Sequence, residues 1–144
     1  MKRKPSENKI LNALLRGELA AVESYRLAIR CYPELAAHPV MESVCADHSQ
    51  AVKTLRNLIV AHGGNPPLEG KGWNFAFEAD EPKHVFTSQS PALAAFKEGE
   101  IHTVRHYALA LEDDGLPYTA KAVIRIELLP LAWKNWVHMA TLVT

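Results

Sequence analysis

Apolar residues recur at steps of three and four along four long stretches of this chain, a spacing that places them on one face of a helix. Proline and glycine mark where these stretches begin and end. The second stretch starts at His38-Pro39 and stops at Gly63-Gly64, which suits proline in a first helical turn and glycine just past the last one. The pattern predicts four helices, near residues 6–31, 39–62, 91–113 and 117–141.

The connections between these helices predict the topology. Only a few residues join the first helix to the second and the third to the fourth, so each pair should form an antiparallel hairpin. Residues 65–89 separate the two hairpins. A helix of roughly 24 residues is about 36 Å long, and about 25 extended residues span about 80 Å. The crossover can therefore run the length of a bundle and leave the second and third helices parallel.

Aromatic residues in this crossover indicate that it packs along the bundle rather than hanging free, and a ligand-binding lid is the alternative. They are Trp73, Phe75, Phe77 and Phe86. We find no internal sequence repeat beyond the two hairpins. The prediction is an all-α four-helix bundle in a single domain, residues 1–144, with two antiparallel hairpins joined by a long crossover at 65–89.

Composition limits the possible functions. The chain has 144 residues, enough for one domain with a core of its own. Its 16 basic and 16 acidic residues cancel, so we expect neither nucleic acid nor a membrane surface as a partner. No apolar run resembles a signal peptide or a membrane span, and we expect a cytoplasmic protein. Cys31 and Cys45 are too few for a disulfide framework and should be reduced thiols.

Polar residues interrupt the apolar face of each predicted helix. They are Glu18, His48, Glu100 and Glu127, one on each helix in that order. Each falls where helical spacing calls for a core residue, so the four side chains should converge inside the bundle. Charges buried in this way are costly unless they are paired, protonated or bound to metal.

Two interpretations of these residues remain open. In the first they are structural: hydrogen bonds from Tyr25 or Tyr107, a neighbouring Arg105 or Arg125, or protonation can keep a carboxyl group in a core. A single core histidine is more often of this kind than a ligand. In the second they hold a metal ion, as carboxylates and imidazoles do in some four-helix bundles.

Three segments resemble known metal-binding helices. ILNALLRGELAAVESYRLAIR is similar to the first helix of bacterioferritins, in which a liganding Glu precedes a Tyr by seven residues, as Glu18 precedes Tyr25 here. EGEIHTVRHYALAL and IELLP resemble the third and fourth helices of rubrerythrin-type proteins. This resemblance implies that Glu100 and Glu127 occupy liganding positions.

Nearly the whole chain is similar to a family of uncharacterised bacterial ferritin-like proteins. The shared landmarks are a GG-x-P turn after the second helix, a tryptophan in the crossover, and a Gly-Glu pair in the third helix followed by a tyrosine. Here they are residues 63–66, Trp73, Gly99-Glu100 and Tyr107. The resemblance implies a ferritin-like four-helix bundle.

Departures from the superfamily pattern bear on function. A complete di-metal site takes a Glu from two helices and a Glu-x-x-His pair from the other two. Here Cys45 stands where the second helix would carry its Glu, and Pro130 stands where the fourth would carry its His. The resemblance therefore implies a degenerate site of Glu18, His48, Glu100 and Glu127. Such a set suits one Fe, Mn or Zn ion, and the adjacent Cys45 favours zinc.

We interpret the chain as a ferritin-like bundle protein that is not a ferroxidase, with no catalytic residue assigned. It would bind one divalent metal or act as a stress-associated interaction protein whose partner the sequence does not name. The alternative is a metal-dependent oxidase or peroxidase with a site rebuilt from the same four residues. A storage cage is disfavoured because the resemblance is to small bundles. Apolar residues on more than one face of the fourth helix predict a homodimer.

Overall fold

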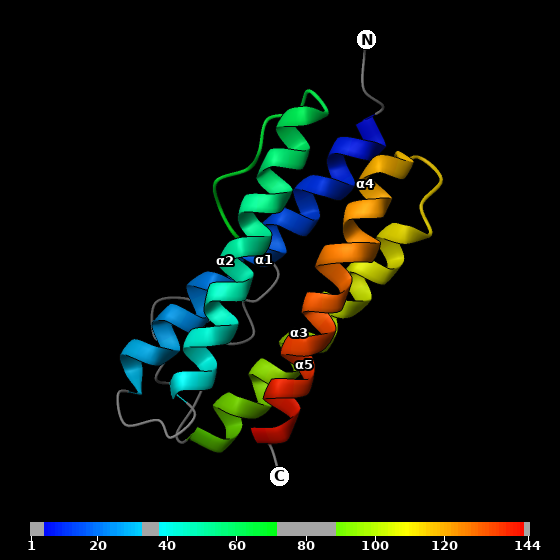
Figure 1. Ribbon diagram of the computed structural model, residues 1–144. Helices are drawn as coiled ribbons and strands as arrows, with labels where there is room; N and C mark the ends of the chain where they lie inside the picture. The colour runs from blue at the N-terminus through cyan, green and yellow to red at the C-terminus, as the bar shows by residue number, and fades with distance from the viewer. Residues whose placement is uncertain (1–4, 33–37, 72–88, 143–144) are drawn as a thin grey trace.

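The computed structural model describes residues 5–32, 38–71 and 89–142, and within these ranges every regular element is helical. The elements are α1 (Pro5–Cys31), α2 (His38–Ala61), α3 (Gln89–Leu111), α4 (Tyr118–Val123), the π-helical turn η2 (Ile124–Leu128) and α5 (Leu129–Leu142). The last three are consecutive and form one continuous rod (Figure 1). The four predicted helices are therefore confirmed, and every bound agrees within two residues.

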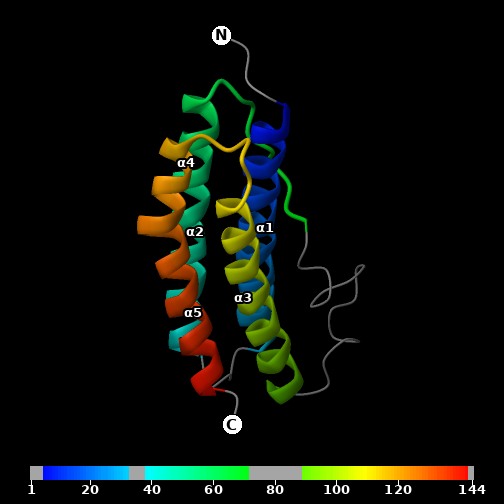
Figure 2. The same cartoon turned by 90° about the vertical axis from the view of Figure 1, so that its right-hand side faces the viewer.

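The helices form a bundle of two antiparallel hairpins (Figures 1 and 2). One hairpin is α1 with α2, and the other is α3 with the rod of α4, η2 and α5. The two hairpins meet where α1 contacts α3 and where α2 contacts α5. In both views α2 and α3 run in the same direction, as the length of the crossover predicted.

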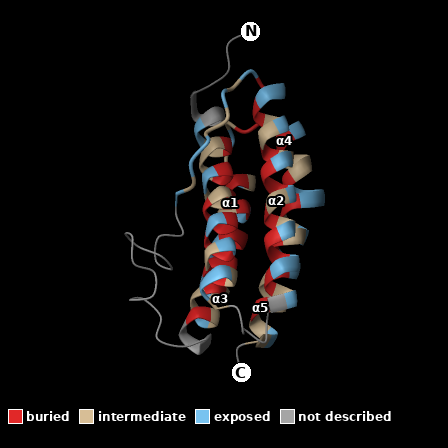
Figure 3. Cartoon of the chain, turned by 90° about the vertical axis from the view of Figure 1, so that its left-hand side faces the viewer, coloured by how far each residue is buried: buried red, intermediate tan, exposed pale blue. Residues whose placement is uncertain are grey.

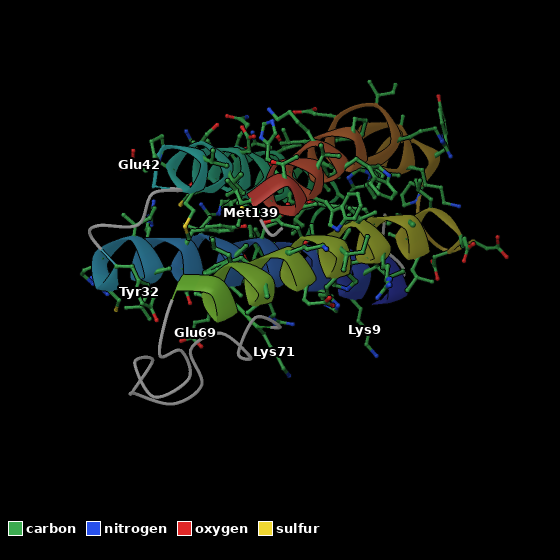
Figure 4. The ribbon with its side chains drawn as sticks, turned by 90° about the horizontal axis from the view of Figure 1, so that it is seen from below. Lys9, Tyr32, Glu42, Glu69, Lys71 and Met139 are labelled. Carbon is green, nitrogen blue, oxygen red and sulfur yellow. The ribbon has the colours of Figure 1, made fainter. Side chains whose placement is uncertain are left out.

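The core lies along the inner sides of the helices, where buried residues face one another and exposed ones face outward (Figure 3). Its largest fully buried apolar side chains come from α1, α2, α3 and the rod of α4, η2 and α5. They are Leu11, Leu15, Met41, Leu55, Ile59, Phe96, Ile124, Leu128 and Met139. Viewed from below, Met139 marks the interior of the bundle (Figure 4). Among the described residues, no helix is long and apolar enough to cross a membrane.

Glycine ends α2 as the sequence predicts. Gly63 has a φ of 78°, a left-handed conformation that costs glycine little. The Gly63 N–H donates to the carbonyl of Val60 at 3.0 Å, and the Gly64 N–H donates to that of Ile59 at 2.8 Å. This pair of bonds is a Schellman motif, which satisfies carbonyls that a helix end leaves free.

The first residues of the crossover dock on α1. The backbone N–H of Lys71 donates to the carbonyl of Arg16 at 2.9 Å, and Lys71 lies on the outer side of the bundle (Figure 4). A Cβ added to Gly70 would lie 2.4 Å from the backbone nitrogen of Ala20, so only glycine fits this approach. The expected packing of Trp73 and the other crossover aromatics concerns residues outside the described ranges.

A π-helical turn changes the phase of the fourth rod. In η2 the N–H of Leu129 donates to the carbonyl of Ile124, five residues back. The buried residues Ala120, Ile124, Leu128 and Ala132 follow in three successive steps of four. In an α-helix each such step turns about 40° too far, because four residues rotate by about 400°. The wider π turn absorbs this excess.

Pro130 lies two residues beyond the end of η2, in the first turn of α5, and explains why the turn widens there. Proline has no N–H to donate, and in an α-helix its ring clashes with the carbonyl four residues earlier. A widened turn before the proline relieves that clash. The core position that the sequence predicts for Glu127 is consequently wrong by one residue, because the buried positions are Ile124, Leu128 and Ala132.

Candidate functional site

Three of the four predicted site residues meet in the centre of the bundle. Glu18 comes from α1, His48 from α2 and Glu100 from α3, and their exposed fractions are 4%, 1% and 0%. The imidazole lies between the two carboxylates. Its Nδ1 is 2.5 Å from Oε1 of Glu18, and its Nε2 is 2.8 Å from Oε2 of Glu100.

Two buried tyrosines complete this cluster by bonding across the bundle. The Tyr25 hydroxyl of α1 donates to Oε2 of Glu100 on α3 at 2.5 Å, and the Tyr107 hydroxyl of α3 donates to Oε2 of Glu18 on α1 at 2.6 Å. Each bond joins the tyrosine of one helix to the glutamate of the other, so an approximate two-fold axis at His48 relates the two bonds. Tyr25 also stacks on the His48 ring, with centroids 5.6 Å apart and planes at 24°.

His48 is protonated in this arrangement. A neutral imidazole has one N–H to donate, whereas both nitrogens of His48 lie against carboxylate oxygens. Burial lowers the pKa of His48, but the charges of Glu100 and Glu18 and their hydrogen bonds outweigh it and raise the pKa well above 6.5. The imidazolium then donates to both carboxylates, which are strong charge-assisted bonds.

The tyrosine hydroxyls stay protonated as well. Burial raises the pKa of Tyr25 well above 10.0, and the charge and hydrogen bond of Glu100 add to this effect. The pKa of Tyr107 is raised in the same way by burial and then by Glu18. Both groups therefore serve as donors that hold the carboxylates in place.

The formal charges of the cluster do not cancel, because two carboxylates and one imidazolium sum to −1. Oε1 of Glu100 is buried and has no hydrogen-bond partner among the described residues. An unpaired carboxylate oxygen in a core is costly, so Oε1 of Glu100 is the cluster atom that a further cationic or donor group would stabilise.

Glu127 lies outside this cluster, so its predicted place in the interior is wrong. Its side chain is exposed and accepts a hydrogen bond from the Thr54 hydroxyl of α2 at 3.1 Å. The cause is the π turn, which rotates Ile124 and Leu128 into the core and leaves Glu127 on the outer side.

Cys45 lies near the cluster as a neutral thiol. Burial raises its pKa, although Arg26 and His48 lower it, and its Sγ lies 3.9 Å from the Val22 carbonyl. A metal ligand would have to be the thiolate. Cys45 and the exposed Cys31 are both free thiols, as expected.

Some of the hydrogen bonds expected from the sequence are present. Tyr25 and Tyr107 do hydrogen-bond the buried carboxylates, whereas Arg105 and Arg125 are exposed. Sequence reasoning missed a signal for this crossed pairing. The motif Gly-Glu-(Leu/Ile)-x-x-Val-x-x-Tyr occurs twice, at residues 17–25 and 99–107, so the statement that the chain has no further repeat is wrong.

The donors suit a metal ion in kind, although not in their present arrangement. Two carboxylates and an imidazole are ligands for Fe, Mn or Zn. Oε1 of Glu100, which has no hydrogen-bond partner among the described residues, is an available ligand atom. Both ring nitrogens of His48 point at carboxylates instead of a common centre. Accordingly, no three His, Cys, Asp or Glu side chains in the described ranges are placed to hold one ion.

Comparison with known proteins adds no family to this description: no protein-family model matches the chain, and no curated protein or solved structure is significantly similar to it.

Proposed function

We propose that this chain is a ferritin-like bundle protein whose centre has fewer ligands than a di-metal site. In this centre one divalent metal ion takes the place of the His48 proton between Glu18 and Glu100. The observation that carries the proposal is the charge of the cluster. Two buried carboxylates with an imidazolium leave −1, whereas two carboxylates with a neutral imidazole and a divalent ion sum to zero. Neutrality matters because an uncompensated charge in a core costs several kcal/mol.

Each cluster residue has a role in this proposal. Glu18 and Glu100 would supply carboxylate oxygens, including Oε1 of Glu100, which has no hydrogen-bond partner among the described residues. His48 would supply one ring nitrogen after giving up its proton. Tyr25 and Tyr107 would orient the carboxylates through the bonds that they already make. Such outer partners commonly change metal affinity by about 10- to 100-fold.

The same geometry argues against a ferroxidase. A di-metal centre needs two bridging carboxylates and two histidines. Here Glu127 is exposed and bonded to Thr54, Pro130 has no donor atom in its side chain, and Cys45 is a buried thiol. One ion is therefore the capacity that these residues support, and oxygen-consuming iron chemistry is not proposed.

Anaerobic titration of metal-free protein with Fe(II), Mn(II) and Zn(II) tests the proposal, with the bound ion counted by elemental analysis. We expect one buried ion per chain in the parent and none in Glu18→Gln or Glu100→Gln. Glu127→Gln is the matched control, because it removes a carboxylate outside the cluster, and it should bind as the parent does.

Three results would contradict the proposal. Glu127→Gln losing the ion as completely as Glu18→Gln would show that the bound metal lies elsewhere. Two Fe(II) per cluster with oxygen uptake would show a working di-iron centre. A parent that binds no ion sensitive to Glu18 or Glu100 would identify the cluster as purely structural.

A further inference from the structure

A second group of histidines lies at the surface between α1 and α3. His102 and His106 are four residues apart on α3, so their side chains project from the same face of the helix. Their ring centroids are 5.6 Å apart with planes at 35°. His102 is exposed and His106 is half-buried, and neither contributes to the Glu18–His48–Glu100 cluster.

The two rings stand at the mouth of a small pocket. Its walls are Leu14, Gly17, Glu18, His102, Thr103, His106 and Tyr107, and it encloses about 10 Å³, room for about one water. Gly17 opens this space, since a Cβ added there would be 3.7 Å from Nδ1 of His106. The carboxylate of Glu18 also lines this pocket, but its two oxygens are bonded within the central cluster, to His48 and Tyr107.

We propose that His102 and His106 form a second, surface metal site, which takes a borderline divalent ion such as Zn(II) or Cu(II) through one nitrogen of each ring. The separation of the rings supports this. Two imidazoles bound to one tetrahedral Zn at about 2.0–2.1 Å have centroids roughly 5 Å apart, so the observed rings need only a small adjustment.

The spacing also suits an imidazole pair. Two histidines at positions i and i+4 on one helix face are an established metal-ligand arrangement. Water completes the coordination, which fits the finding that no three protein ligands gather in the described ranges.

This site does not depend on the buried ion, and the test separates the two. Titration calorimetry with Zn(II) and Cu(II) is done on the His48→Gln protein, which lacks the imidazole of the central cluster. We expect one Zn(II) per chain there, and at least a tenfold weaker Kd after His106→Ala or His102→Ala. The Cu(II) complex should show two equatorial nitrogens by electron paramagnetic resonance.

His138→Ala is the matched control. His138 lies on α5 with Lys134 and Leu142 at the i−4 and i+4 positions, so no histidine stands one turn away on its own helix, and its removal should leave the Kd unchanged. An unchanged Kd in the His102→Ala/His106→Ala double variant would overturn the proposal, and so would an equal loss in His138→Ala. Neither result would alter the count of ions sensitive to Glu18 and Glu100.

Discussion

Replacing His48 with glutamine removes the imidazolium that lies between two buried carboxylates. In the metal-free protein the ring contacts Glu18 on one side and Glu100 on the other, and all three are nearly inaccessible to solvent. Glutamine keeps an amide donor and similar length but carries no charge. The variant therefore isolates the contribution of the imidazolium from that of the packed side chain.

The expected cost follows from the burial of all three groups. Removing one partner of a buried ion pair typically costs about 3–5 kcal/mol, since it leaves an uncompensated charge in the core. That is a large fraction of the roughly 5–15 kcal/mol by which domains are stable. We expect His48→Gln to lose about 3–5 kcal/mol at pH 6.

The pH dependence gives a sharper check. Burial lowers the pKa of His48, but Glu100 and Glu18 raise it well above 6.5 overall, so the folded state holds this proton more tightly than the unfolded state does. The resulting stability is fully present below about pH 6.5 and is lost as pH rises from there through the folded pKa. Within that window the free energy of unfolding should fall by about 1.4 kcal/mol per pH unit.

Guanidinium unfolding followed by tryptophan fluorescence, with a chelator present, measures both quantities between pH 6 and 9. The parent should show the slope and His48→Gln should lack it. His102→Gln is the control for an exposed histidine and should keep the slope of the parent. A parent whose stability is flat above pH 6.5, or a variant with the same slope, would refute the reasoning.

Three further outcomes are expected. Deleting Ile126, which is 77% exposed in the π turn, should lower the free energy of unfolding by about 3 kcal/mol, because Pro130 would then stand in a regular helix. Adding Pro130→Ala should restore most of this loss, as measured by urea unfolding. Gly70→Ala should cost about 1–3 kcal/mol by forcing backbone apart, whereas Gly17→Ala, with its nearest atom at 3.7 Å, should gain about 0.5–1 kcal/mol. The parent should be a dimer by light scattering at high micromolar concentration, and Trp133→Glu, on the exposed apolar side of α5, should shift it toward monomer; a parent of monomer mass would contradict this.

Hydrophobic spacing and punctuation were enough to predict the helices and the direction of each. Gly63 ends α2 because a left-handed residue closes a Schellman motif there, which is local chemistry readable from Gly63-Gly64 alone. The inward positions of Glu18, His48 and Glu100 were predictable for the same reason, since α1, α2 and α3 keep a regular α-helical phase around them.

The position of Glu127 could not be predicted in this way. Assigning a face to a residue assumes about 100° of rotation per residue, and one π turn breaks that assumption for all residues beyond it. Pro130 was visible as a perturbation of the helix, but a kink and a widened turn are alternative responses to the same lost N–H. The choice between them depends on which residues the neighbouring helices can bury.

The crossed tyrosine bonds have a consequence for the unfolding rate of this protein. They join residues 75 and 89 positions apart in the chain, so they form only after both hairpins have been brought together. Contacts between residues so far apart in sequence form only after the entropy cost of closing a long loop has been met, so they tend to form late in folding. Interactions absent from the transition state act chiefly on the unfolding rate. The Tyr25–Glu100 and Tyr107–Glu18 bonds should therefore slow unfolding. Removing a hydroxyl with Tyr25→Phe or Tyr107→Phe would shorten the lifetime of the native state while leaving the refolding rate nearly unchanged.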